Sequence, residues 1–405
     1  MRSYRHLPPS RALLLLCLLL GLATGPANAQ ATEGFVLLDS VHYTLSNSPF
    51  FQKQTPIAKI LRSGNQLYFL VAETGQLQRL DLSTGQVTQL LPKSDAKEAL
   101  KIYNFELSSD RVFVITAQMS HIYEYDLQGQ LLRSIKINPM FRKTWLSGFR
   151  NFHFSEARQA FYLDVAPNTP VERNMLRKPE AAKKHFERQN LIAEVDTRGR
   201  IRQTLGSFAP IYRQNLYFHS SDYNHFVTPA GKIVMTQGLS HALSLIDPAS
   251  GTTDTFAFPG QYISNTDIPV TTQPYLESED YYSHVLTTYD YPYLQPLNAS
   301  RLCYRGYRDA GVDSTRFKTY PPREVPANNK ACVSPSQRKL DQMELLQQKP
   351  YYVQIIDHQH NKLLYDGVFN LLGKYFLPAH QAPEAHFYTY FWDTDGMHIY
   401  TYGLR

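Results

Sequence analysis

The sequence predicts an all-β protein, a six-bladed β-propeller whose blades are four-stranded antiparallel sheets. Three observations predict this fold. One hairpin pattern recurs along the chain, its spacing is close to the length of a propeller blade, and the two ends of the chain hold strands that together complete one blade.

The recurring hairpin is clearest at residues 122–137, IYEYDLQGQLLRSIKI, where apolar and polar residues alternate on both sides of an Asp-Leu-Gln-Gly turn. In each copy an Asp ends the strand before the turn, namely Asp81, Asp126, Asp196, Asp247 and Asp357. Such an Asp accepts hydrogen bonds from backbone N–H groups of the turn, and glycines adopt turn conformations that other residues resist. These glycines are Gly75, Gly85, Gly129, Gly199 and Gly251. We therefore expect a structural role for the Asp residues and not a catalytic one.

The spacing of the copies predicts the blade length and two insertions. Consecutive copies lie 45, 70, 51 and 110 residues apart, and about 45 residues suit four short strands. A further strand precedes each turn, as QLYFLVAE precedes the first. The longer spacings hold polar, helix-prone segments around 168–190 and 309–349, which we interpret as insertions between strands of one blade.

The two ends of the chain predict ring closure. The C-terminal segments HFYTYFW and GMHIYTYG give two strands, and the N-terminal segment GFVLLDSVHYTL holds Asp39, 42 residues before Asp81, at the place expected for a third strand. N-terminal strands would then close the last blade and remove exposed sheet edges. The alternative is seven blades, because the long interval before Asp357 has room for a degenerate blade.

Residues 1–29 have the features of an export signal peptide. A basic start precedes an apolar run of about a dozen residues and an Ala-x-Ala cleavage site at 27–29. We expect residues 30–405 to form the mature chain, a single β-propeller domain without a transmembrane segment, in the periplasm or outside the cell. A membrane anchor would need a longer apolar run, and the large Leu16 before Cys17 disfavours lipidation. Without the signal peptide the net charge falls from +6 to +3, which gives no indication of nucleic-acid binding.

Two cysteines remain in the mature chain, Cys303 and Cys332. An even number of cysteines in an exported protein favours a disulfide between them. The alternative is two buried free thiols.

Candidate ligand contacts come from two aromatic stretches. The stretch 277–294 contributes Tyr281, Tyr282, Tyr289 and Tyr291, and the strand RLCYRGYR at 301–308 contributes Tyr304 and Arg305. Exposed Tyr rings stack on sugars or peptide side chains, and clustered Arg side chains bind carboxylate or sulfate. The same residue types also suit strand interiors and ion pairs with neighbouring acids.

The sequence offers no recognised catalytic motif. It contains no zinc or calcium motif, no nucleophile elbow and no phosphate loop, so we predict no catalytic residue, metal or cofactor. His358 and His360 would share one face on a strand, but they lie at a turn of the repeat, where we expect them to be exposed.

Several segments resemble a known group of proteins. They are KPYYVQIIDHQHNKLLYDG, LGKYFLP, WDTDGMHIYTY and the strand CYRGYR. With the repeat, they make the chain similar to bacterial six-bladed propellers of the TolB-like class, and within it to an uncharacterised family of exported propeller proteins. The resemblance implies the fold and a location in the cell envelope, and it carries over no catalytic residues. Such relatives are often lipoproteins, a feature from which the context of Cys17 departs.

These observations favour an exported, non-enzymatic propeller that binds a ligand or an envelope protein or glycan. The alternative is an envelope hydrolase or lyase acting on carbohydrate or a small ester at the channel mouth, and a third possibility is a scaffold. Propellers of one fold perform all three roles. Acids and His converging at the channel mouth would favour the enzyme, whereas a mouth lined by Tyr and backbone would favour binding.

Overall fold

The computed structural model describes most of the chain after residue 34. The described residues are 35–44, 57–91, 101–116, 120–138, 140–141, 144–166, 178–216, 223–264, 268, 270, 272, 288–309, 351–369, 371–379, 383, 386–393 and 396–404. The predicted signal peptide and most of the 309–349 insertion lie outside this part of the chain.

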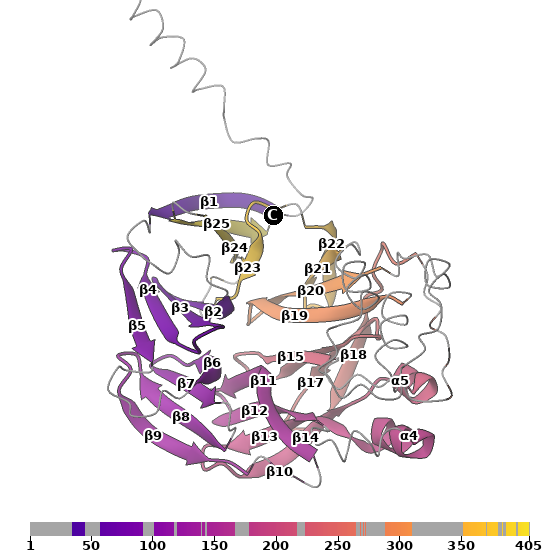
Figure 1. Cartoon of the computed structure of the whole chain (residues 1–405). Coiled ribbons are helices and arrows are strands. Elements are labelled where there is room, and N and C mark those ends of the chain that lie inside the picture. The colour runs from indigo at the N-terminus through magenta and orange to yellow at the C-terminus, as the bar shows by residue number, and fades with distance from the viewer. Residues whose placement is uncertain are drawn as a thin grey trace, which may run out of the picture.

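The described strands form six antiparallel sheets arranged around a ring (Figure 1). Blades 1 to 3 consist of β2 (Ile57–Ser63), β3 (Gln66–Val71), β4 (Leu77–Asp81) and β5 (Val87–Leu91); β6 (Ile102–Leu107), β7 (Arg111–Thr116), β8 (His121–Asp126) and β9 (Leu131–Lys136); and β11 (Thr144–Ser155), β12 (Ala160–Ala166), β13 (Asn190–Asp196) and β14 (Ile201–Ser207), with the short β10 (Met140–Phe141) beside β11. Blades 4 to 6 consist of β15 (Tyr223–Val227), β16 (Ile233–Gln237), β17 (Ala242–Ile246) and β18 (Thr253–Ala257); β19 (Asp290–Asn298), β20 (Leu302–Arg308), β21 (Tyr351–Asp357) and β22 (Lys362–Val368); and β23 (Tyr375–Leu377), β24 (His386–Trp392), β25 (Gly396–Leu404) and β1 (Phe35–Thr44). The six-bladed fold predicted from the sequence is confirmed.

Ring closure differs in one detail from the sequence prediction. Strand β1 pairs with β25 from Phe35 opposite Leu404 to Thr44 opposite Gly396, so it is the outer strand of blade 6 and not the third strand. Asp39 lies inside β1 next to a bulge, not before a turn. The C-terminal part contributes three strands to this blade, whereas the sequence predicted two, because β23 was not recognised as a strand. A single strand without its own hairpin turn carries no signal for its place in a sheet.

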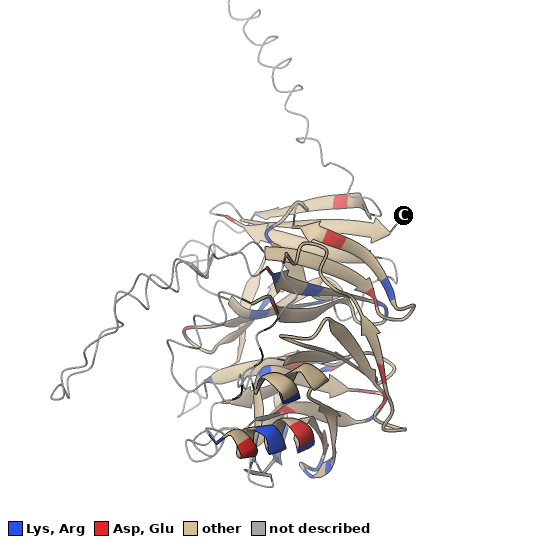
Figure 2. Ribbon diagram, turned by 90° about the vertical axis from the view of Figure 1, so that its right-hand side faces the viewer, with Lys and Arg blue, Asp and Glu red and all other residues tan. Residues whose placement is uncertain are grey.

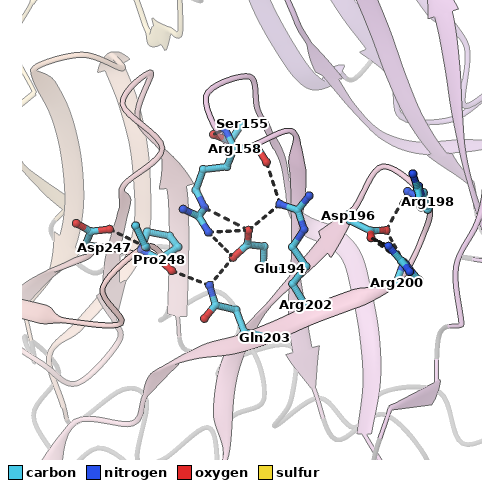
Figure 3. Close-up of polar contacts among 11 residues, drawn as sticks. Ser155, Arg158, Glu194, Asp196, Arg198, Arg200, Arg202, Gln203, Asp247 and Pro248 are labelled. Carbon is cyan, nitrogen blue, oxygen red and sulfur yellow. Dashed lines mark hydrogen bonds and ion pairs between the residues drawn. The ribbon is translucent and has the colours of Figure 1, made fainter.

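The five Asp turns have the predicted geometry. In each turn the Asp Oδ1 atom accepts at least one backbone N–H of the following residues, at 2.7–3.1 Å. Figure 3 shows the turns at Asp196 and Asp247 in neighbouring blades. Gly199 has a φ of +81°, and a Cβ at this position would overlap the carbonyl oxygen of Lys136 in blade 2. This turn therefore requires glycine both for its conformation and for the packing of two blades.

Both faces of each sheet are packed, because every blade lies between two others. One apolar cluster joins Phe113 and Ile122 of blade 2 to Phe161 and Val195 of blade 3. Buried acids on the third strands are neutralised within the blade. Glu194, which is fully buried, contacts Arg158 and Arg202 and accepts a hydrogen bond of 2.6 Å from Gln203 (Figure 3).

The antiparallel order gives the ring two different faces. The turns from first to second strand and from third to fourth strand lie on one face, which we call the turn face. The links from second to third strand and from blade to blade lie on the other, which we call the connection face. Helix α4 (Pro179–Arg188) lies between β12 and β13 and helix α5 (Pro210–Asn215) between β14 and β15, so both belong to the connection face (Figure 2). They pack together through Phe186, whose ring centroid is 5.9 Å from that of Tyr212 in α5.

Strand β20 ends, and strand β21 begins, at the same face. No helix in the described part of the chain is both long enough and apolar enough to cross a membrane.

Candidate functional site

Polar contacts join each inner strand to the next blade around the whole ring, at its inner strand or at the segment that follows this strand. They are Lys59 Nζ to Phe105 O (2.7 Å), Asn104 Nδ2 to Gly148 O (2.9 Å), His225 N to Asn151 Oδ1 (3.4 Å), Asn224 Nδ2 to Pro292 O (2.8 Å), Asn298 Nδ2 to Pro383 O (2.6 Å) and Arg62 N to Pro378 O (2.9 Å). Most of these donors are side chains that reach a backbone carbonyl. The wall of the central channel is therefore polar and cross-linked.

A cluster of polar side chains, most of them ionisable, occupies this wall in blades 1 to 4. We call it the channel network, and it consists of Lys59 (β2), Glu106 (β6), Asn151 and His153 (β11), Asp164 (β12) and His225 (β15). A large bulge in β11 shapes it. Ser147 pairs with Asp164 and Phe152 pairs with the adjacent Leu163, so four residues of β11 have no partner in β12. Bulges of this kind redirect side chains and are common beside functional sites.

One half of the channel network is an ion-paired carboxylate. Nδ1 of His153 lies 3.0 Å and Nζ of Lys59 3.5 Å from Oε2 of Glu106. Burial alone would raise the pKa of Glu106, but the charges of Lys59 and His153 lower it to about 2. Burial also lowers the pKa of Lys59, and Glu106 opposes that change. This half holds a charged, compensated carboxylate.

The other half lacks this compensation. Asp164 Oδ1 accepts a hydrogen bond of 2.9 Å from Asn151 Nδ2, and Nδ1 of His225 lies 3.5 Å from the same oxygen. Burial raises the pKa of Asp164 to about 7, although Asn151 and the charge of Arg150 oppose this rise. Burial lowers the pKa of His225 well below its usual value. Neither ring nitrogen of His225 makes a hydrogen bond within the described residues.

The two halves meet through their imidazoles. The ring centroids of His153 and His225 are 5.4 Å apart at an interplanar angle of 65°. The channel network thus contains two carboxylate–imidazole pairs, an arrangement that holds protons and accepts hydrogen bonds. Among the described residues, no three His, Cys, Asp or Glu side chains are placed to hold a metal ion.

A second feature, the tyrosine patch, lies at the connection-face ends of blades 5 and 6. It consists of Tyr293, Tyr304, Tyr351, Tyr375, Tyr390 and Trp392. Tyr293 and Tyr375, on the inner strands, are each 51% exposed, and Tyr351 is 37% exposed. Inner strands begin at the connection face, so these two rings lie at that end of the channel.

The rings of the tyrosine patch contact one another. The centroid of Tyr293 is 6.1 Å from that of Tyr351, and the centroid of Tyr375 is 6.0 Å from that of Trp392. Tyr304 lies between the two groups, because it stacks on Phe376 at 4.3 Å and affects the pKa of both Tyr351 and Tyr390. The patch offers several aromatic faces with hydroxyl groups attached.

The structure places three of the six ligand contacts expected from the sequence inside the packing between blades. Tyr289, Tyr291 and Arg305 are buried. Arg305 donates to the carbonyl oxygens of His241 and Phe258 and to Gln354, and its guanidinium lies 4.1 Å from the ring centroid of Tyr291. The ligand role of these residues stays a prediction.

The other predicted residues have mixed positions. Tyr304 joins the tyrosine patch, and Tyr281 and Tyr282 lie outside the described residues. Cys303 is buried on β20, where burial raises the pKa of its thiol to about 12. Cys332 is outside the described residues, so the disulfide also stays a prediction.

The two histidines considered as a metal pair do not point to one site. Nδ1 of His360 lies 2.9 Å from Asp357 Oδ2 at the turn surface. His358 is buried against Phe226, with ring centroids 5.6 Å apart. The expectation that both histidines are exposed is wrong for His358, because the turn packs against blade 4.

The channel network was not predicted from the sequence. Its members come from inner strands, which no turn motif marks, and from four different blades. One signal was available: Glu106 and His153 occupy the same level of their inner strands, opposite Phe113 and Tyr162 of the second strands. Aligning inner strands from blade to blade would have placed them side by side.

Two solved structures have a similar fold over nearly the whole chain. One is a member of the DUF4221 family from Bacteroides vulgatus, with a TM-score of 0.60 and 12% identity over 92% of this chain and 99% of that one. The other, a protein from Bacteroides fragilis that bears the name of an exported protein, has a TM-score of 0.53 and 9% identity over 94% and 98% of the two chains. The chain shares its fold with these two proteins.

At these identities the likeness concerns the fold. It confirms the resemblance to uncharacterised exported propeller proteins, whereas membership of the TolB-like class stays a prediction. No protein family matches the chain by sequence, and no curated protein matches it significantly.

Proposed function

We propose that the protein is exported and acts without catalysis, binding a glycan or an envelope protein at the connection-face mouth of its channel. The observation that carries this proposal is the tyrosine patch. Its half-exposed rings lie on inner strands at the channel end, where flat apolar faces and hydroxyl groups suit a carbohydrate ring or a peptide side chain. The export signal predicted for residues 1–29 and the name of the Bacteroides fragilis protein support a periplasmic or extracellular location.

A glycan is the ligand that the patch suits best. Its exposed rings carry hydroxyl groups, and the two charges that act on Tyr351 compensate each other, because Arg308 pairs with Asp290 through two contacts. Aromatic faces with neutral hydroxyls match the alternating apolar faces and hydroxyl rims of sugar rings.

The test is a binding screen of the mature protein against envelope glycans and peptides, repeated with a Tyr293→Ala/Tyr375→Ala variant. We expect at least one glycan to bind, and the variant to weaken it at least about tenfold, because each lost stacking contact contributes about 1 kcal/mol. Tyr103→Ala is the matched control, since Tyr103 is 40% exposed on the inner strand of blade 2. Binding that survives in the double variant would refute the role of the patch.

One observation favours the second candidate, an envelope hydrolase or lyase acting on carbohydrate or a small ester. Acids and histidines converge in the channel network, where His153 is oriented by Glu106 as a general base would be. Assays of ester and glycosidic bond cleavage with the wild type and a His153→Gln variant test it, with His121→Gln as the control. Turnover lost only in the first variant would establish the enzyme and overturn the non-catalytic proposal.

A further inference from the structure

Asp164 is a buried acid that has no cationic partner among the described residues. Other buried acids of the blades have one. Glu124 contacts Arg111 and Arg133, and Asp357 contacts Arg301. For Asp164, no Lys or Arg in the described part of the chain comes within ion-pair distance, and Arg150 acts on it only electrostatically.

The side chain beside Asp164 is also unsatisfied. His225 is 1% exposed, and neither of its ring nitrogens has a hydrogen-bond partner among the described residues. A neutral imidazole has one nitrogen that accepts a hydrogen bond, and leaving buried polar atoms unpaired is unfavourable. Asp164 and His225 together therefore present two neighbouring acceptors to a ligand that donates.

In the described ranges, the other titratable groups around Asp164 are engaged with other partners or exposed. The hydroxyl of Tyr223 donates to Leu191 O at 2.8 Å. Glu106 is compensated by Lys59 and His153, and Arg150 is exposed. His153, whose ring adjoins that of His225, keeps 17% of its side chain exposed, so solvent reaches the edge of this site.

We propose that Asp164 and His225 form a binding site for a protonated primary amine, such as that of an amino sugar or a small amino compound. The ammonium group donates one hydrogen bond to the Asp164 carboxylate and one to the acceptor nitrogen of His225. This gives the buried carboxylate the cation that the described part of the chain does not provide. The site is distinct from the tyrosine patch and does not depend on it.

Binding of an ammonium group is coupled to the ionisation of Asp164. Below neutral pH the carboxyl group is largely protonated in the free protein, because burial raises its pKa to about 7. The amine needs the carboxylate, so each binding event below neutral pH releases up to about one proton from Asp164. Affinity accordingly rises with pH until Asp164 is ionised.

The experiment is calorimetric titration of the mature protein with glucosamine, ethanolamine and lysine, and with N-acetylglucosamine as the neutral counterpart of glucosamine. Measuring at about pH 6 and about pH 8.5, in two buffers of different ionisation enthalpy, counts the protons released. We expect at least one amine to bind and N-acetylglucosamine not to bind. Which amine binds best distinguishes an amino sugar from an amino acid or amino alcohol.

Two variants separate this site from the rest of the protein. Asp164→Asn keeps a carbonyl oxygen for Asn151 and removes the buried charge, so it folds, and we expect it to weaken amine binding at least about tenfold and to abolish proton release. Tyr293→Ala/Tyr375→Ala leaves amine binding unchanged. Unaltered affinity in Asp164→Asn, equal binding of N-acetylglucosamine, or no amine binding at pH 8.5 would each overturn the proposal, whatever the outcome of the glycan screen.

Discussion

Nδ1 of His225 lies 3.5 Å from Oδ1 of Asp164, and both side chains are buried in the channel wall. Burial affects the two groups in opposite directions, because it disfavours the charged form of each. The pKa of Asp164 rises to about 7, and that of His225 falls well below its usual value. Below neutral pH the pair therefore stays largely uncharged unless a ligand provides a cation.

The first prediction concerns Asp164→Asn and pH. Folding raises the pKa of Asp164 from 3.8 to about 7, so between these values the folded protein holds a proton that the unfolded chain has released. Stability from this group is then greatest below about pH 4 and is lost as pH rises through 7. We expect Asp164→Asn to stabilise the protein at pH 8, by about 4 kcal/mol at most, and to change little at pH 4.

Urea unfolding of both proteins at the two pH values measures this effect. Asp254→Asn is the control, since Asp254 is exposed on β18. We expect this substitution to leave the free energy of unfolding unchanged at both pH values. A destabilised Asp164→Asn at pH 8 would show that the carboxylate has a cationic partner in the free protein.

The second prediction compares two glycines at equivalent turns. Gly199 and Gly251 both have positive φ, +81° and +74°. A Cβ at Gly199 would overlap Lys136 O of the neighbouring blade, whereas one at Gly251 would meet no atom within 4 Å. We expect Gly251→Ala to cost about 1 kcal/mol, from backbone strain alone, and Gly199→Ala to cost about 3 kcal/mol, from strain and overlap.

The difference between the two variants in urea unfolding isolates the packing of blade 2 on blade 3. If both variants lose the same free energy of unfolding, the two blades can move apart at this turn without a cost in stability.

The repeat could be predicted because its signals are local. An Asp at a strand end and the glycine after it are three or four residues apart, and the hydrogen bonds of the Asp side chain lie within one turn. The place of β1 could not be predicted in the same way. Its strand character was evident, but its pairing with β25 depends on residues more than 350 positions away, and Asp39 resembled a turn residue by chance.

The candidate site was harder to predict for two physical reasons. The channel network forms only when four blades come together, and the bulge that brings Asn151 to Asp164 is marked in the sequence only by Gly148. The alternation in RLCYRGYR correctly groups Cys303, Arg305 and Tyr307 on one face of β20, but both faces of a propeller blade are buried. Alternation therefore could not show whether Arg305 meets a ligand or a neighbouring blade.

The third prediction tests the role of Arg305. Its guanidinium satisfies two backbone carbonyls and Gln354 in a fully buried position. We expect Arg305→Met to destabilise the protein by about 3 kcal/mol, because several buried acceptors lose their donors. Arg308→Met on the same strand is the control. We expect it to lower the free energy of unfolding by about 1 kcal/mol or less, since the pair of Arg308 with Asp290 is partly exposed.

Denaturation curves and the ligand screen together decide between two roles for Arg305. If Arg305→Met keeps the stability of the wild type but no longer binds a ligand that the wild type binds, Arg305 contacts the ligand as the sequence predicted.

The fourth prediction concerns the ion pair between Lys59 and Glu106. Lys59→Met leaves a buried carboxylate with His153 as its remaining partner in the network. We expect a loss of about 2 to 3 kcal/mol at pH 7, because an uncompensated buried charge is unfavourable. The exposed pair of Lys183 and Glu187, at 4.0 Å on α4, provides the control variant Lys183→Met, which we expect to be nearly neutral.

The acid dependence of the Lys59 variant gives a second readout. Folding lowers the pKa of Glu106 from 4.5 to about 2, so its stabilisation is fully present above about pH 4.5 and is lost as pH falls toward 2. Without Lys59 the folded-state pKa rises, and the loss of stability between pH 5 and pH 3 becomes smaller than in the wild type. If urea unfolding instead gives parallel acid profiles for Lys59→Met and the wild type, Lys59 does not hold the charge of Glu106, and His153 alone must do so.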